Sequence, residues 1–148
     1  MAAGSAAALI CDTGALIDYL VESAPDHTLF RDAINKARTR YVPGLVLAEV
    51  DYFLRDERSA MHVFMQDLAR GAFTCAAPTV GQLSRAMEVD RHFADLGLGL
   101  VDGSVVALAE SLGIRRLVTR DVRHFAAVRL RDGRAFELVV HPTTPEKT

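Results

Sequence analysis

The chain has 148 residues, of which 50% are hydrophobic and 24% charged, so it is not a disordered or fibrous protein and we expect one compact domain. Its formal net charge is −2, so overall charge gives no argument for a nucleic-acid partner. No apolar run reaches membrane-spanning length, and the first ten residues lack the basic start of a signal peptide, which predicts a cytoplasmic protein with no membrane partner.

Apolar periodicity predicts strands that alternate with helices. In chain order these are a strand at 7–11, a helix after the break at 12–14, a helix at 25–38, a strand at 41–42, helices at 45–55 and 58–70, a strand at 73–76, helices at 79–95 and 101–112, and strands at 117–119 and 136–140. The helix at 79–95 carries its apolar positions at Val80, Leu83, Met87 and Phe93.

This alternation, with no hairpin signal before the end of the chain, predicts an α/β fold with a mostly parallel central sheet flanked by helices on both faces. We expect residues 1–140 to form this single domain and residues 141–148 to form a loose C-terminal tail. Cys11 and Cys75 lie in predicted strands without metal-ligand spacing, so we expect both to be buried in the core of a protein from a reducing compartment.

Positive charge is concentrated between residues 114 and 134. This segment has a formal charge of +5, which leaves −7 for the rest of the chain. Its seven arginines are Arg115, Arg116, Arg120, Arg123, Arg129, Arg131 and Arg134. The segment is either a surface that contacts phosphates or an acidic partner, or simply a solvated face.

Two aspartates come directly after predicted strands. Asp12 follows the first strand and Asp121 follows the strand at 117–119. Ligands of open parallel sheets collect at the carboxyl ends of the strands, so we expect these two carboxylates to be neighbours at one edge of the sheet.

Two further acids lie on the apolar faces of helices. Glu49 shares a face with Val46, Val50 and Phe53, and this stripe is predicted to be buried. Asp102 begins a helix that carries its apolar residues on the same face, namely Val105, Val106 and Ala109. A buried ionised carboxylate must be paired, hydrogen-bonded or coordinated to a cation.

Each acid also has a simpler explanation. Asp12, Asp102 and Asp121 each precede a helical segment and could be N-caps, and Glu49 could pair with an arginine or point outward. Taken together, four acids at strand tips and on flanking helices indicate an oxygen-rich pocket for a hard divalent cation, Mg²⁺ or Mn²⁺.

Four ordered motifs give the chain a resemblance to the PIN-domain ribonucleases, and among them to the VapC-type toxins of bacterial type II toxin–antitoxin pairs. The motifs are Ile10-Cys11-Asp12-Thr13, Leu47-Ala48-Glu49-Val50, Leu100-Val101-Asp102-Gly103-Ser104-Val105-Val106-Ala107, and Leu117-Val118-Thr119-Arg120-Asp121 followed by His124-Phe125. The resemblance covers about the whole chain. Gly14 departs from it, since related chains often have Ser or Asn there, and we expect this glycine to serve the tight strand-to-helix turn.

The resemblance implies a metal-dependent endoribonuclease that hydrolyses RNA phosphodiesters. It assigns Asp12, Glu49, Asp102 and Asp121 as the catalytic and metal-binding acids, with Thr13, Ser104 and Thr119 as supporting hydroxyls. It also implies a cognate antitoxin, a homodimer, and an apolar groove that could include Phe30, Tyr52, Phe53, Phe64 and Met65.

Arg120 and Arg123 flank Asp121 and are candidates for contacts with RNA phosphates, although a role in salt bridges is as plausible. His124 is interpreted as a structural residue, because a single histidine before an apolar residue is usually one.

Three alternatives use the same acids differently. A receiver-like phospho-switch would need a lysine beyond a late strand, but the only lysines are Lys36 and Lys147. A phosphatase with an aspartate nucleophile would need a second aspartate where Gly14 stands. A degenerate PIN domain that only binds RNA or protein would keep four like charges together without using them, which is energetically costly.

Overall fold

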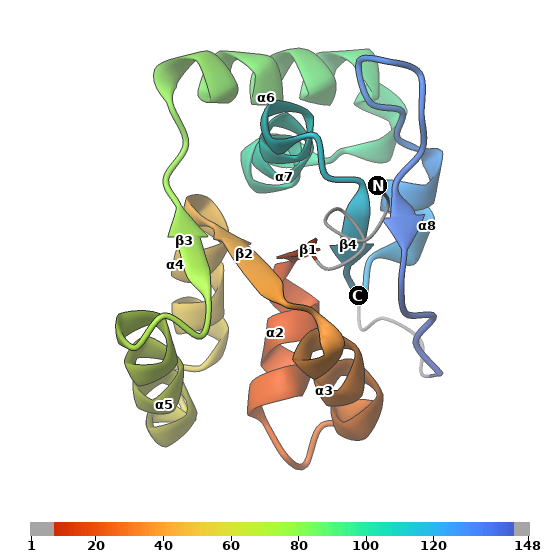
Figure 1. Ribbon diagram of the computed structural model, residues 1–148. Helices are drawn as coiled ribbons and strands as arrows, with labels where there is room; N and C mark the ends of the chain where they lie inside the picture. The colour runs from red at the N-terminus through yellow and green to blue at the C-terminus, as the bar shows by residue number, and fades with distance from the viewer. Residues whose placement is uncertain (1–7, 144–148) are drawn as a thin grey trace.

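The computed structural model describes residues 8–143. Its centre is a five-stranded parallel sheet (Figure 1). The strands have the spatial order β3-β2-β1-β4-β5, and every neighbouring pair is parallel. Their bounds are β1 Ala8–Cys11, β2 Thr39–Pro43, β3 Thr74–Ala76, β4 Arg116–Val118 and β5 Glu137–Leu138. The predicted α/β fold is therefore confirmed.

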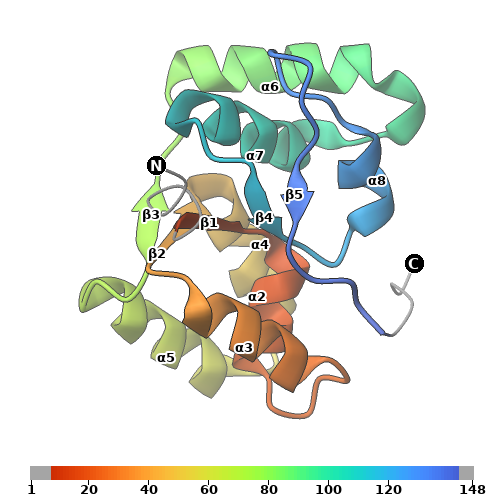
Figure 2. The ribbon, with the colours of Figure 1, turned by 45° about the vertical axis from the view of Figure 1, so that its right-hand side comes forward.

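Helices cover both faces of the sheet (Figures 1 and 2). They are α2 Thr13–Leu20, α3 His27–Lys36, α4 Gly44–Phe53, α5 Arg58–Ala69, α6 Val80–His92, α7 Gly99–Leu112 and α8 Val122–Ala127, with a 3₁₀ turn at Ala94–Leu96. Helices α2, α3 and α5 lie on one side of the sheet, and α6 and α7 lie on the other. None of the helices within residues 8–143 is both long and apolar enough to cross a membrane.

The strand order reverses at the centre of the sheet, between β1 and β4. The chain runs outward from β1 to β2 and β3, and then returns through α6 and α7 to the other side of β1. Leu9, Ile10 and Cys11 of the central strand are fully buried, because helices cover both faces of a parallel sheet. This reversal is the point where such sheets usually bind their ligands.

One residue predicted to be buried is exposed, and two apolar positions of the predicted helix at 79–95 also lie outside the core. Phe53, the last residue of α4, is 57% exposed, and the buried side chain is that of Leu54, which follows the helix as its C-cap and is 1% exposed. Val80 and Met87 of α6 are exposed, whereas Ala86 and Val89 face the core. The packing partners of a helix choose which residues along a mixed stripe are buried, and small Ala86 suits the close approach of α7.

Other predictions for single residues are confirmed in some cases and wrong in others. Cys11 is buried as predicted, but Cys75 is exposed on β3, because β3 is the edge strand of the sheet. Phe30 and Phe64 are fully buried core residues, while Tyr52 and Met65 are exposed. Thr143 donates a hydrogen bond to Asp26. The domain boundary at residue 140 stays a prediction, and residues 144–148 of the predicted tail lie outside the described part of the chain.

Gly103 is expected to be indispensable where α6 meets α7. A Cβ atom at this position would lie within 3.0 Å of backbone atoms of Ala86, which cannot move without displacing α6. We expect Gly103→Ala to lower the free energy of unfolding by about 2 kcal/mol, as overpacking does. Urea denaturation measures this, with Gly81→Ala in open space on α6 as the control, which should gain up to about 1 kcal/mol. Equal effects of the two substitutions would contradict this packing account.

Candidate active site

The register of β1 against β4 brings Asp12 beside the turn that carries Asp121. Cys11 is paired with Val118, and the Asp12 amide donates to the Val118 carbonyl at 3.0 Å. Thr119, which directly follows β4, donates its hydroxyl to Asp12 Oδ2 at 2.8 Å and accepts a hydrogen bond from the Asp121 amide at 2.9 Å. One buried threonine therefore links the Asp12 carboxylate to the backbone of Asp121.

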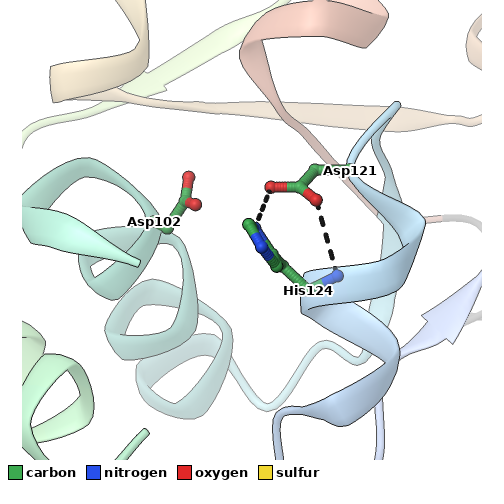
Figure 3. A group of neighbouring side chains, drawn as sticks. All are labelled: Asp102, Asp121 and His124. Carbon is green, nitrogen blue, oxygen red and sulfur yellow. Dashed lines mark hydrogen bonds and ion pairs between the residues drawn. The ribbon is translucent and has the colours of Figure 1, made fainter. Parts of the chain in front are cut away.

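A compact group of ligand atoms lies in front of this edge (Figure 3). The group consists of Asp102 from α7, Asp121 at the N-cap of α8 and His124 from α8. Each residue offers one ligand atom, and these three atoms lie within 4.8 Å of one another. Asp102 is the fourth residue of α7, which begins at Gly99, so it is not the N-cap considered from the sequence. Asp121 does cap α8, because it accepts the His124 amide at 3.4 Å.

Glu49 lies farther along the same edge. Thr13 donates its hydroxyl to Glu49 Oε1 at 2.6 Å, and Thr13 directly follows Asp12. Asp12 and Glu49 are not in the compact group formed by Asp102, Asp121 and His124. Hydrogen bonds tie Glu49 to Thr13 and Asp12 to Thr119, whereas Asp102 on α7 belongs to the site through the closeness of its carboxylate to Asp121 and His124.

The environment of Asp12 opposes its ionisation. Burial, assisted by the negative charges of Glu49 and Asp121, raises the pKa of its carboxyl to about 6, against the opposing effect of hydrogen bonds from Thr119 and from the Thr13 backbone. Asp12 is therefore held in a place where an isolated anion is unfavourable. A cation bound among these carboxylates would reverse that penalty.

His124 is a member of the site that the sequence interpretation missed. Its Nδ1 lies 2.7 Å from Asp121 Oδ2, which is hydrogen-bonding distance. The spacing contained a signal, since a residue three positions after a helix-capping aspartate lies one turn above it. His124 orients the Asp121 carboxylate toward Asp102.

The three predicted supporting hydroxyls divide into two classes. Thr13 and Thr119 donate to Glu49 and Asp12, as described above. Ser104 instead donates to the Val101 carbonyl at 2.6 Å, within α7. A serine inside a helix commonly bonds to the preceding turn, so Ser104 supports the helix rather than an acid.

Arg120 has a buried structural position in place of the predicted phosphate contact. Its Nη1 lies 2.5 Å from Asp18 Oδ2 and 3.0 Å from Asp26 Oδ2, and its side chain is only 14% exposed. Its guanidinium also lies over the Phe30 ring. This leaves Arg123, which is exposed beside Asp121, as the candidate for an RNA contact.

Gly14 is explained by this arginine. A Cβ at Gly14 would lie 3.1 Å from Cβ and Cγ of Arg120. Gly14 is inside α2 and does not have a positive φ, so the expectation that it serves a tight turn is wrong. The missing side chain gives room for Arg120 to reach across α2 to its acids.

Comparison with known proteins gives consistent results. The sequence profile of the PIN domain family matches residues 9–130. The curated protein Ribonuclease VapC26 of Mycobacterium tuberculosis is 31% identical over 134 residues, which cover 88% of this chain and 99% of that protein.

Solved structures share the fold. The crystal structure of Mycobacterium tuberculosis VapC20, a toxin that cleaves the sarcin-ricin loop, superposes with a TM-score of 0.71 at 17% identity and covers 80% of this chain and 94% of that one. A toxin–antitoxin complex from Klebsiella pneumoniae gives a TM-score of 0.64 at 19% identity, covering 81% of this chain and 92% of that one. The structure of VapBC2 from Rickettsia felis, bound to a DNA fragment from its promoter, gives a TM-score of 0.58 at 17% identity and covers 80% of this chain and 90% of that one.

Proposed function

This chain belongs to the PIN-domain family, in its VapC-type branch, and from that premise we propose that it is a divalent-metal-dependent endoribonuclease. It acts in the cytoplasm as the toxin of a toxin–antitoxin pair, and its catalytic residues are Asp12, Glu49, Asp102 and Asp121. The observation that carries the proposal is the arrangement of these acids at the point of strand reversal, with Asp102 and Asp121 in one compact group.

The donor chemistry of the pocket fits Mg²⁺ or Mn²⁺. Carboxylate oxygens are the preferred ligands of these hard ions. The raised pKa of Asp12, caused by burial and by neighbouring negative charge, is the behaviour expected of a carboxylate whose counter-charge is a bound cation. A cation held by Asp102 and Asp121, with Asp12 and Glu49 beside them, would supply an activated water and neutralise charge on the phosphate.

The hydroxyls and His124 hold the acids in place. Thr119 fixes one oxygen of Asp12 and the backbone of Asp121, while Thr13 fixes one oxygen of Glu49. His124 fixes one oxygen of Asp121. Partners that orient ligands in this way typically affect metal affinity or activity by about 10–100-fold.

The proposed protein partner is an antitoxin. Two of the structural neighbours are toxin–antitoxin proteins: one is a toxin–antitoxin complex and the other is VapBC2 bound to promoter DNA. Five exposed apolar side chains on α3, α4 and α5 offer an apolar surface for such a partner, namely Leu29, Tyr52, Phe53, Val63 and Met65. The predicted homodimer remains a prediction.

The receiver-like alternative lacks support. Lys36 is the last residue of α3 and does not follow a strand, and Lys147 lies outside the described residues. The degenerate, non-catalytic PIN domain is distinguished by the experiment below.

Asp102→Asn is expected to reduce RNA cleavage by more than about 100-fold, because loss of a direct metal ligand should exceed the effect of losing an orienting partner. The assay uses a mixed pool of structured RNA that includes tRNA, with Mg²⁺ or Mn²⁺ and with EDTA. The control is Asp56→Asn, an exposed aspartate between α4 and α5, which should cleave as the unsubstituted protein does.

RNA cleavage that continues in EDTA, or in the Asp102→Asn variant, would contradict the metal-dependent mechanism. Metal binding without cleavage of any RNA in the pool would favour the non-catalytic alternative.

A further inference from the structure

A second polar site lies at the other end of α7 from Asp102. It is a surface cavity of about 570 Å³, bounded by the start of α6, the end of α7 and the turn at residues 130–134. Four arginines from separate parts of the chain line it, namely Arg85, Arg115, Arg131 and Arg134. Three of these belong to the arginine-rich segment that the sequence singled out, so the tertiary structure gathers that charge at one place.

The walls of this cavity are held by fixed contacts. Arg85 makes two hydrogen bonds to Glu110, at 2.8 and 2.9 Å, and Glu110 also accepts the backbone amide of Arg131 at 2.7 Å. Arg115 donates to the Ala135 carbonyl at 3.0 Å. Glu110 therefore joins α6, α7 and the 130–134 turn, and Arg85 is neutralised by it.

The remaining guanidinium groups are available to a ligand. The side chains of Arg131 and Arg134 are 69% and 67% exposed, and their nearest carboxylates are 3.9 Å away, against 2.8 Å for Arg85. The turn that carries them is closed by backbone hydrogen bonds between Leu130 and Arg134 and between Gly133 and Leu130. With Arg85 and Glu110 paired, the other three arginines face two acids. Asp132 lines the cavity and Glu88 lies 3.9 Å from Arg131, so the net charge there is +1.

We propose that this cavity is an accessory site for the phosphodiester backbone of RNA, separate from the acidic pocket. Guanidinium groups match phosphate oxygens in planar, bidentate geometry. A cavity of this volume also has room for a nucleotide unit. The accessory site holds a second part of the RNA whose scissile bond lies at the acids, so the inference rests on the proposed function.

The spacing between the two sites suits one RNA molecule. Asp102 and Ser111, which lines the cavity, are nine residues apart on α7, or about 13 Å at the helical rise. Arg115 and Asp121 stand at opposite ends of β4. At the ~3.4 Å axial spacing of a helical strand, this separation is about four stacked nucleotides. The acidic pocket repels RNA in the absence of a cation, so a positive site nearby would supply affinity.

The test measures RNA binding without cleavage. Asp102→Asn protein in EDTA is titrated with a fluorescently labelled stem-loop RNA at several salt concentrations. Adding Arg131→Gln and Arg134→Gln is expected to weaken binding by about tenfold per arginine. It should also reduce the slope of log affinity against log salt by about 1.4 to 1.8, since each lost phosphate contact removes 0.7 to 0.9.

The matched control is Arg58→Gln with Arg70→Gln, which removes the same charge from exposed arginines on α5, far from α6 and α7 (Figures 1 and 2). The proposal would be overturned if the Arg131/Arg134 variant kept the same slope of log affinity against log salt. It would also be overturned if the control variant lost as much RNA affinity. Competition by polyglutamate as effective as unlabelled RNA would also overturn it, because the cavity would then be a site for an acidic protein.

Cleavage assays separate this proposal from the nuclease itself. With Asp102 intact, the Arg131/Arg134 variant should have a raised KM for the stem-loop RNA and unchanged cleavage of a trinucleotide too short to reach both sites. Cleavage with no change in KM or salt slope would reject the accessory site alone. Binding with the expected salt slope, but no cleavage by the unsubstituted protein, would reject the nuclease and leave the RNA site.

Discussion

Asp12→Asn is expected to abolish metal-dependent RNA cleavage and, without metal, to raise the free energy of unfolding by about 3 kcal/mol at pH 7. The carboxyl has a pKa raised from 3.8 to about 6 by burial and by Glu49 and Asp121. At ~1.4 kcal/mol per pH unit, ionising it in the folded protein costs about 3 kcal/mol. An asparagine keeps an acceptor for the Thr119 hydroxyl without the charge.

The pH dependence gives the sign of this effect. Between about pH 4 and 6 the folded protein retains a proton at Asp12 that the unfolded chain has lost, so stability falls as pH rises through this window. Below pH 4 both states are protonated and the penalty disappears. Above pH 6 the full penalty is present. The free energy of unfolding of the Asp12→Asn variant should therefore change little between pH 4 and 6. Below pH 4 it should equal that of the unsubstituted protein.

Urea denaturation in EDTA at a series of pH values measures this effect, with Asp56→Asn as an exposed control that should shift neither the profile nor cleavage. Mn²⁺ should stabilise the unsubstituted protein more than the Asp12→Asn variant, because ligand binding stabilises only a state that binds it. Retained cleavage by Asp12→Asn would remove this residue from the mechanism. An unchanged pH profile would show that Asp12 is not a strained carboxylate.

Arg120→Met is expected to lower the free energy of unfolding by about 3–5 kcal/mol, the usual cost of removing one partner of a buried ion pair. Asp18 and Asp26 are both buried, and burial raises the pKa of Asp18 against the opposing effect of Arg120. Methionine keeps apolar contact beside Gly14 and Phe30 but leaves both carboxylates without this cation. The loss should diminish at acidic pH, where the carboxylates take up protons.

Two comparisons make the Arg120 prediction specific. Arg116→Met on the same strand region removes a partly exposed pair with Glu137 and should cost less than about 1 kcal/mol. Adding Asp18→Asn and Asp26→Asn to Arg120→Met should recover much of the lost stability, since the buried charges disappear. A cost below 1 kcal/mol, or no recovery in the triple variant, would show that charge pairing does not hold this cluster.

The order of the elements was predictable from the sequence because their signals are local. Alternation of short apolar runs with helical periodicity indicated the parallel sheet. The rule that strand ends meet at one edge then placed Asp12 beside Asp121, which the pairing of Cys11 with Val118 confirms. Helical periodicity singled out Glu49 and Asp102 as acids on apolar helix faces, and the resemblance to the PIN family assigned all four acids to one site.

The tertiary structure alone decided which side chains meet. Phe53 and Leu54 are apolar neighbours at the end of α4, and only the packing of this helix end buries Leu54 and exposes Phe53. Asp18 and Asp26 lie about a hundred residues from Arg120, yet they engage the arginine that stands next to a candidate catalytic acid. Arg131, Arg134 and Arg85 share one cavity for the same reason. Periodicity is a property of a few neighbouring residues, whereas burial and ion pairing depend on atoms that folding brings from distant parts of the chain.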